Sequence, residues 1–336
     1  EEMFLAHSAI LNGLPTDAVA KISIYNRQLQ NNAIKQMTLP AANDKYKEYA
    51  KELEELVNDK MSESNNIVHE KYITISAEKK NIKEARTYFA RVGSDLAADF
   101  AKISSQITEL GYKERLRLFY EFFRGNEAGE FSFELKKAMA RGAHFKDYIS
   151  PDNIEFKRDY MQIGDRYARV LFLKEYPSFL KDELLSQLTD FSRSMMVSVD
   201  VQPIPTDEEV KEIQKKLLAI ETDITKWQQK QNMANNFSAT VPYEMEQMRS
   251  EIKEFMDDLT ARDQRMMFVT MTLVHLADSL AELDNDTETL MSIGRKDLCN
   301  LSVLKFQQED GLNTVLPYGL MEIDAVRTLT TESTAV

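Results

Sequence analysis

The sequence predicts an α+β protein made of two subdomains, and three observations lead to this fold class. Apolar residues alternate along some segments with period two, as in strands, and along others with the helical period. Beyond residue 150 these segments follow the order strand, helix, strand, given twice, which is the ferredoxin-like split pattern. Between the two halves of that pattern lies a long insertion at about 206–263 with a coiled-coil repeat.

The first half of the chain reads as a mixture of strands and helices. Residues 1–18 include Gly13, Pro15 and Asp17 and receive no element, so we expect a tail or linker there. Many β-branched residues between 67 and 76 favour a strand. The predicted elements are a strand at 20–25, a helix at 44–60, a strand at 67–76, a helix at 81–104, a short strand near 107 and a helix at 113–124.

Glycines mark the expected domain boundary. Gly125, Gly129 and Gly142 lie among acidic residues and a short helical segment, a composition typical of a linker. The predicted parts are an N-terminal α+β subdomain at 1–125, a linker region with a short helix at 126–150, and a ferredoxin-like subdomain at 151–336.

The second half begins with a hairpin signal. Gly164 and Asp165 separate two β-rich runs, as in a two-residue turn between paired strands. The predicted elements are strands at 154–163 and 167–175, a helix at 179–191, strands at 195–201 and 266–276, a helix at 278–297 and a strand at 301–307.

The insertion is predicted to be an antiparallel helical hairpin. Pro205 and a capping box of Thr206 and Glu209 start its first arm, and the polar run 235–242 breaks the helix. Apolar residues spaced by three and four form a seam on each arm. They are Val210, Ile213, Leu217, Ile220, Ile224 and Trp227 in the first arm and Met245, Met248, Ile252, Phe255 and Leu259 in the second. An arm of this length extends about 40 Å and projects from its domain or packs along a neighbour.

Composition narrows the class of protein. The 336 residues are 43% hydrophobic and 29% charged, as in globular proteins with room for two domains. A net charge of −13 argues against broad nucleic-acid binding. The single cysteine, Cys299, excludes an intramolecular disulfide and lies at the start of an apolar strand, so we expect a buried structural thiol. No signal peptide opens the chain and no apolar run approaches about 20 residues, so we expect a cytosolic or peripheral membrane protein.

Residue patterns for nucleotide or metal chemistry are absent from the sequence. None of the ten glycines precedes lysine, and neither a G-x-G-x-x-G nor a G-x-S-x-G motif occurs. The acidic run 284–288 resembles the start of a calcium loop, but Thr289 and Arg295 replace its glycine and its glutamate, so we interpret it as a helix face. We therefore expect no catalytic, cofactor-binding or metal-binding residue. The four histidines form no cluster: His7, His69, His144 and His275.

Several separated sequence runs point to one family. Two examples are Asp257-Asp-Leu-Thr-Ala-Arg-Asp-Gln-Arg-Met-Met-Phe and Asp310-Gly-Leu-Asn-Thr-Val-Leu-Pro-Tyr-Gly-Leu. With them the chain resembles the large traffic ATPases of type IV secretion systems, the VirB-four class, and looks most like those of conjugative elements of Gram-positive bacteria. The runs are 66–74, 84–93, 145–152, 165–174, 203–208, 235–239, 257–268, 310–320 and 327–333.

The resemblance implies that this chain matches the region before the motor domain. In that family a RecA-like domain with Walker motifs follows, binds ATP and Mg, and couples hydrolysis to pilus biogenesis and substrate transfer. The chain ends at Val336 before any such motif, so no catalytic residue of the family is carried over. The family's N-terminal region is associated with docking to membrane components and to other subunits.

We therefore expect a non-catalytic N-terminal domain of a conjugation ATPase, cytoplasmic and peripheral at the inner face of the cell membrane. Its expected partners are other secretion subunits and a second copy of itself, without strong nucleic-acid binding. The alternative is a stand-alone adaptor or scaffold that acts through the hairpin, and an enzyme with an unrecognised carboxylate site is a third class. The candidate partner interface is the turn between the arms, with Asn235, Asn236, Phe237 and Val241.

Overall fold

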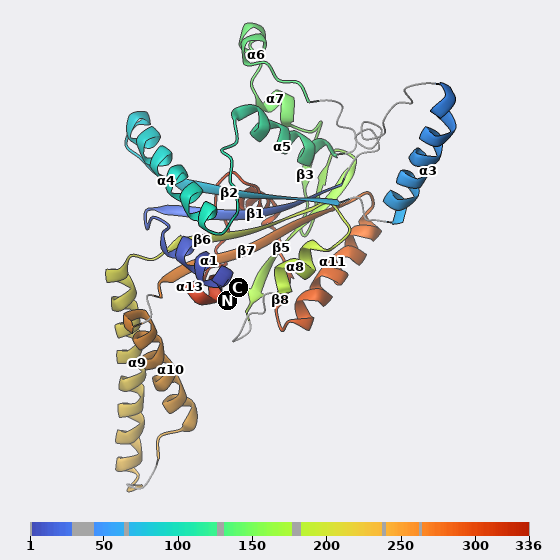
Figure 1. The fold of residues 1–336 in the computed structure, drawn as a ribbon. Coiled ribbons are helices and arrows are strands. Elements are labelled where there is room, and N and C mark those ends of the chain that lie inside the picture. Colours follow the sequence, from blue (N-terminus) through green and yellow to red (C-terminus); the bar gives the residue numbers. More distant parts are fainter. Residues whose placement is uncertain are drawn as a thin grey trace.

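A computed structural model gathers the nine described strands into one antiparallel sheet with helices on both faces (Figure 1). It describes residues 2–28, 44–63, 67–125, 131–176, 183–236, 240–261 and 264–335. The strands are β1 (Ala18–Gln28), β2 (Ile67–Ala77), β3 (Ile154–Phe156), β4 (Met161–Ile163), β5 (Arg166–Glu175), β6 (Met195–Pro203), β7 (Met266–Ala277), β8 (Asn300–Val303) and β9 (Arg327–Thr330).

The helices lie between these strands and at the two ends of the described chain. In the first half they are α1 (Glu2–Asn12), the 3-10 helix η1 (Asp44–Tyr46), α3 (Lys47–Glu63), α4 (Ile82–Lys102), α5 (Tyr112–Arg124), α6 (Leu135–Arg141) and α7 (Lys146–Ile149). In the second half they are α8 (Glu183–Thr189), α9 (Thr206–Met233), α10 (Tyr243–Ala261), α11 (Leu280–Lys296), α12 (Gln308–Val315) and α13 (Thr331–Ala335).

The sheet follows the order β2-β1-β6-β7-β5-β4-β3, with β8 beside β5 and β9 beside β7. Side chains of its central strands are buried on both faces. On one face Met196 and Val274 pack against α5 and α12. On the other face Val197 and Leu273 pack against α8 and α11, and Val201 packs against α1 and α4. The core therefore has three layers, with the sheet in the middle.

The predicted fold class, with a ferredoxin-like second subdomain, is wrong. Strands β5 to β8 pair in the order β8-β5-β7-β6, but the sheet continues past β6 into the first half of the chain. Strand β1 pairs with β6 from Ala20↔Val201 to Asn26↔Met195, and β2 then pairs along the whole of β1. A period-two pattern tells which side chains share a face but not which strand lies beside them. The domain boundaries near residues 125 and 150 stay predictions.

Most individual elements occur where the sequence predicts them, but some were missed. The short strand expected near 107 is absent, since the described residues 103–111 form no regular element. Residues 1–18 were expected to be a tail, yet they contain α1, which packs on α13 with the His7 Nδ1 atom 3.0 Å from the Ala335 carbonyl. The two ends of the chain therefore lie side by side (Figure 1). The helices α12 and α13 and the strand β9 were also not predicted.

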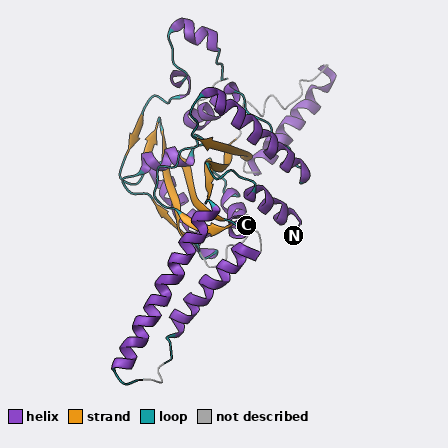
Figure 2. Cartoon of the chain, turned by 90° about the vertical axis from the view of Figure 1, so that its left-hand side faces the viewer, coloured by secondary structure: helices purple, strands orange, loops and turns teal. Residues whose placement is uncertain are grey.

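The insertion does form two helices, but the predicted long coiled-coil hairpin is wrong. Helices α9 and α10 leave the sheet together as antiparallel arms, referred to below as the α9/α10 pair (Figure 2). Ile213 packs at the sheet end of the pair with the partly buried Ile252. Farther out, Trp227 is only half-buried and Met248 is 53% exposed. The seam is buried at Ile220 and Ile224 in α9 but does not stay closed along the whole of both arms, and α10 is nine residues shorter than the 28-residue α9.

None of the described helices, the long α9 included, has a stretch that is both long and apolar enough to cross a bilayer.

Candidate functional site

The far end of the α9/α10 pair contains the candidate partner interface, and two of its residues serve to end α9. Asn235 adopts a left-handed conformation with φ of 56° and donates its N–H to the Asn232 carbonyl at 3.0 Å. The Asn236 N–H donates to the Gln231 carbonyl at 3.0 Å, which completes a Schellman motif. The Asn236 Nδ2 atom also donates to Gln231 Oε1 at 3.1 Å. The two asparagines therefore determine where the turn starts.

The remaining candidates at this end differ in exposure. Val241 is half-buried, and Phe237 lies outside the described residues. Two neighbours that the sequence did not single out are much more accessible. Met233, the last residue of α9, is 86% exposed, and Tyr243, the first residue of α10, is 79% exposed. The structure thus places an exposed thioether and an exposed phenol on either side of the turn.

A signal for Met233 was present in the sequence. The seam of α9 passes through Ile220, Ile224 and Trp227, and the same spacing continues at 231 and 234. Met233 falls between those two positions, so its side chain points away from the seam. An apolar residue outside the seam of a helix end is a candidate for contact with another molecule.

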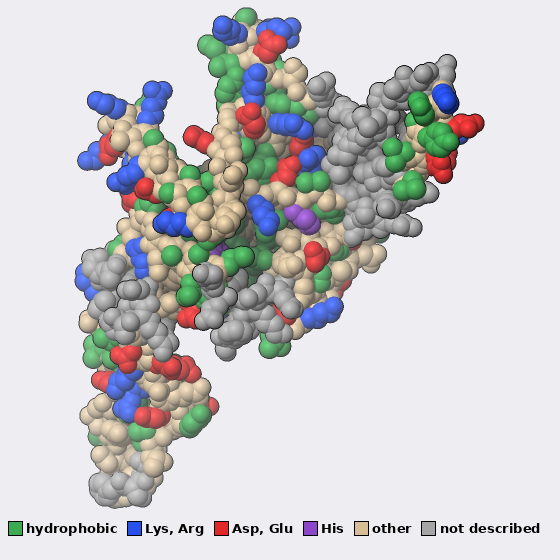
Figure 3. Space-filling view, in the orientation of Figure 1, with side chains coloured by type: hydrophobic (Ala, Val, Ile, Leu, Met, Phe, Trp, Pro, Cys, Tyr) green, Lys and Arg blue, Asp and Glu red, His purple; other side chains and the backbone are tan. Residues whose placement is uncertain are grey.

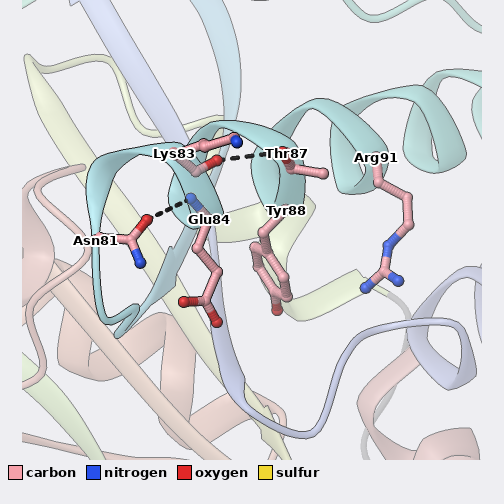
Figure 4. Close-up of a pocket in the computed structure, with 6 residues that line it drawn as sticks. All are labelled: Asn81, Lys83, Glu84, Thr87, Tyr88 and Arg91. Carbon is pink, nitrogen blue, oxygen red and sulfur yellow. Dashed lines mark hydrogen bonds between the residues drawn. The ribbon is translucent and has the colours of Figure 1, made fainter.

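A second candidate is an open hollow of about 480 Å³ over the first turns of α4 (Figure 4). The hydrogen bonds within it belong to the helix itself. Asn81 Oδ1 accepts from the Glu84 N–H at 2.9 Å as the N-cap, and Thr87 Oγ1 donates to the Lys83 carbonyl at 3.2 Å. The lining residues are Asn81, Lys83, Glu84, Thr87, Tyr88 and Arg91. Among the described residues, the lining comes from one helix and its cap, and it supplies no opposing wall of catalytic groups.

Tyr88, which lines this hollow, holds α4 against the start of β1. Its hydroxyl donates to Asp17 Oδ1 at 2.8 Å, and the Lys79 ammonium pairs with the other oxygen of Asp17. The same ammonium lies 3.5 Å from the centre of the Tyr88 ring. Hydrogen bonds from Lys79 and Tyr88 lower the pKa of Asp17, whereas burial and the bond to Asp17 raise the pKa of Tyr88 to about 12. These contacts indicate a structural role.

A row of polar side chains fills the sheet face beneath α12. Ser23 on β1 lies opposite Ser198 on β6, with their hydroxyls 2.8 Å apart, and Ser198 Oγ donates to the Val315 carbonyl at 2.6 Å. Two residues along the same strands, the buried Lys21 ammonium pairs with Asp200 and donates to the Thr314 carbonyl. The row thus supplies donors to the last carbonyls of α12, which have no partner within the helix.

His275 is a buried neutral histidine whose tautomer follows from its neighbours. Thr287 Oγ1 donates to the Leu283 carbonyl at 2.7 Å and accepts from Arg169 Nη1 at 2.8 Å. His275 Nε2, which lies 3.1 Å from the same oxygen, must therefore carry the proton and donate it. Burial, aided by the charge of Arg169, lowers the pKa of His275 to about 3. This network connects β5, β7 and α11.

Metal-binding clusters of three or more His, Cys, Asp or Glu side chains do not occur among the described residues. The acidic run 284–288 lies inside α11, where Asp284 pairs with Arg169 at 2.8 Å and Asp286 with Arg193 at 3.3 Å. It is therefore a helix face, as the sequence indicates. Cys299 is 2% exposed, which confirms the expected buried thiol, and burial raises its pKa.

Comparison of the chain with protein-family models finds no match, and comparison with curated proteins finds none either. The proposal of function therefore depends on the resemblance of the sequence runs and on the geometry of the exposed helices.

Proposed function

We propose that this chain is a non-catalytic docking and assembly region of a type IV secretion traffic ATPase, working in the cytoplasm at the inner face of the cell membrane. The sequence runs that resemble this family support the proposal. ATP and Mg would act in a motor domain that the resemblance expects after this region. The activities assigned to the chain itself are contacts with other secretion subunits and self-association.

One observation carries the docking role. The α9/α10 pair projects from the sheet (Figure 2), and large apolar side chains are exposed at its far end. Met233, Tyr243 and Met248 are 86%, 79% and 53% exposed. Apolar side chains gathered on an exposed surface with a polar rim are typical of partner contacts, and Tyr and Met are enriched in them. The length of α9, about 40 Å, allows its end to reach a neighbouring subunit.

The test is the double substitution Met233→Gln with Tyr243→Ala in the full-length protein. We expect an unchanged melting temperature, because both side chains are exposed. Capture of partner subunits and the frequency of conjugative transfer should fall about tenfold or more, the loss typical of a central interface tyrosine. Leu218→Gln is the matched control, since Leu218 is 67% exposed on the flank of α9. Equal losses in the control, or unchanged capture in the double variant, would contradict the proposal.

The alternative is a stand-alone adaptor or scaffold, and a second projecting helix is compatible with it. Helix α3 exposes Tyr49, Leu53 and Leu56 by half or more, and these residues lie on one face. Two separate docking faces suit a scaffold as well as an ATPase subunit. The reading frame after Val336 separates the two functions: a Gly-x-x-x-x-Gly-Lys-Ser/Thr motif supports the ATPase, and a stop codon supports the adaptor.

A further inference from the structure

Helix α6 forms the outermost part of the molecule on the side opposite the α9/α10 pair, and α7 lies between it and α5 (Figures 1 and 2). Three apolar side chains are exposed there. Leu135 and Met139, four residues apart on one face of α6, are 49% and 72% exposed, and Phe145 just before α7 is 43% exposed. These residues, together with the cations between them, are called the α6 tip.

Lys and Arg side chains lie beside apolar side chains at the α6 tip, at the top of the molecule in the space-filling view (Figure 3). Residues 131–149 contain four Lys or Arg and only two carboxylates, although the whole chain has a net charge of −13. Glu134 pairs with Lys137 at 2.8 Å. The other three cations have no carboxylate partner within the described structure: Lys136, Arg141 and Lys146.

The base of the tip is held by buried aromatic contacts, so the exposed side chains project from an ordered support. Phe133 is 5% exposed and packs edge-on against Tyr148, with ring centres 4.9 Å apart. At the other end of α6, Gly142 takes a left-handed conformation with φ of 67°, and the Ala143 N–H donates to the Ala138 carbonyl at 3.0 Å. This Schellman ending fixes the direction of the chain towards Phe145.

We propose that the α6 tip binds an anionic lipid surface, with Leu135, Met139 and Phe145 entering the headgroup region and Lys136, Arg141 and Lys146 contacting lipid phosphates. Apolar residues flanked by Lys and Arg are the composition that binds such surfaces. An acidic chain can approach an anionic surface by a projecting tip, because salt screens charges beyond about 8 Å at physiological ionic strength. The proposal rests on the proposed function only for placing the chain at a membrane.

Charge complementarity favours the α6 tip over α3 as the part of the molecule that binds an anionic lipid surface. Helix α3 also exposes apolar residues, but its 17 residues contain six carboxylates and three lysines. An anionic surface would repel α3 and attract the α6 tip. The two helices are therefore expected to serve different partners.

The test is sedimentation of the chain with vesicles of phosphatidylcholine containing phosphatidylglycerol, compared with phosphatidylcholine alone. We expect binding to the anionic vesicles only. Each cation near an anionic surface strengthens binding about fivefold, so the triple variant Lys136→Gln, Arg141→Gln and Lys146→Gln should bind about a hundredfold more weakly. Leu135→Gln with Met139→Gln should also weaken binding, by about tenfold or more.

Two control variants on α9 change the same kinds of residue elsewhere. Lys215→Gln, Lys216→Gln and Lys230→Gln remove three exposed cations, and Leu218→Gln removes an exposed apolar side chain. Neither should change vesicle binding. The proposal is overturned if anionic vesicles are not bound, if the tip variants bind like the unchanged chain, or if the α9 controls lose as much. Because tip variants should still capture partner subunits, failure here is distinct from failure of the proposed function.

Discussion

Lys21 on β1 lies directly opposite Asp200 on β6, with its ammonium 2.6 Å from Oδ1 and 2.7 Å from Oδ2 of the carboxylate. Both side chains are buried, and the same ammonium donates to the Thr314 carbonyl at the end of α12. Burial raises the pKa of Asp200 to about 6 and lowers that of Lys21, while their mutual attraction opposes both shifts. One ion pair thus links the N-terminal strand, the central sheet and a helix near the C-terminus.

Lys21→Met should destabilise the protein by about 3–5 kcal/mol, because it leaves Asp200 buried without its partner. The double variant Lys21→Met with Asp200→Leu should recover much of that loss, since no unpaired charge remains. Urea unfolding of the two single variants and the double variant measures the coupling. Additive losses would show that the pair does not act as a unit.

The pH dependence of stability should reveal the raised pKa of Asp200. The folded protein keeps this proton up to about pH 6, whereas the unfolded chain loses it near the ordinary aspartate pKa of 3.8. The contribution of Asp200 to the free energy of unfolding is therefore fully present below about pH 4 and is lost as pH rises to about 6. Relative to Asp200→Asn, which cannot titrate, the unchanged protein should lose about 3 kcal/mol of unfolding free energy across this window. A difference that stays constant between pH 4 and pH 6 would contradict this assignment.

Two helical glycines should respond in opposite ways to alanine. A Cβ on Gly311 in α12 would lie 2.4 Å from Leu304 Cδ1 and 2.9 Å from Val170 Cγ1, both buried side chains. Gly311→Ala should therefore cost about 1–3 kcal/mol. A Cβ on Gly93 in α4 would meet nothing within 4 Å, so Gly93→Ala should stabilise by about 0.5–1 kcal/mol. Thermal unfolding of the two variants is the measurement, and a loss of stability for Gly93→Ala would refute the comparison.

Substitutions at a buried and at an exposed position of α9 should affect the local stability of the helix to different extents. Ile224 is 5% exposed, and Ile224→Ala should lower the free energy of opening of α9 by about 2–5 kcal/mol. Leu218 is 67% exposed, and Leu218→Ala should leave it nearly unchanged. Hydrogen exchange of the α9 amides measures this local stability. Equal protection of the α9 amides from exchange in the two variants would show that the stability of α9 does not depend on the burial of Ile224.

This chain alone should not bind ATP appreciably, because the sequence lacks the glycine-lysine pattern that cradles phosphates. Calorimetry with Mg-ATP should give no heat of binding in the micromolar range. A one-to-one complex of that affinity would require a nucleotide site of another kind.

Most of the local structure could be predicted from the sequence, because local structure depends on nearby residues. The period-two runs gave β1, β2, β5, β6 and β7, and the helical runs gave α4, α5 and α11. The polar run after α9 predicted its end, and Asn235 and Asn236 provide the cap that ends it. The apolar context of Cys299 predicted its burial.

Which strands are neighbours and which of their faces are covered depends on contacts between distant parts of the chain, so these features could not be predicted. In β1, Ile22 and Ile24 alternate with Lys21 and Ser23, and this pattern predicted the strand but not which of its faces is buried. In the structure Lys21 and Ser23 are 0% exposed, while both isoleucines remain half-buried. The reason is that α12, nearly 300 residues later, ends over this face with carbonyls that need donors, and β6 offers an acidic partner in register. Neither requirement can be read from the residues around β1.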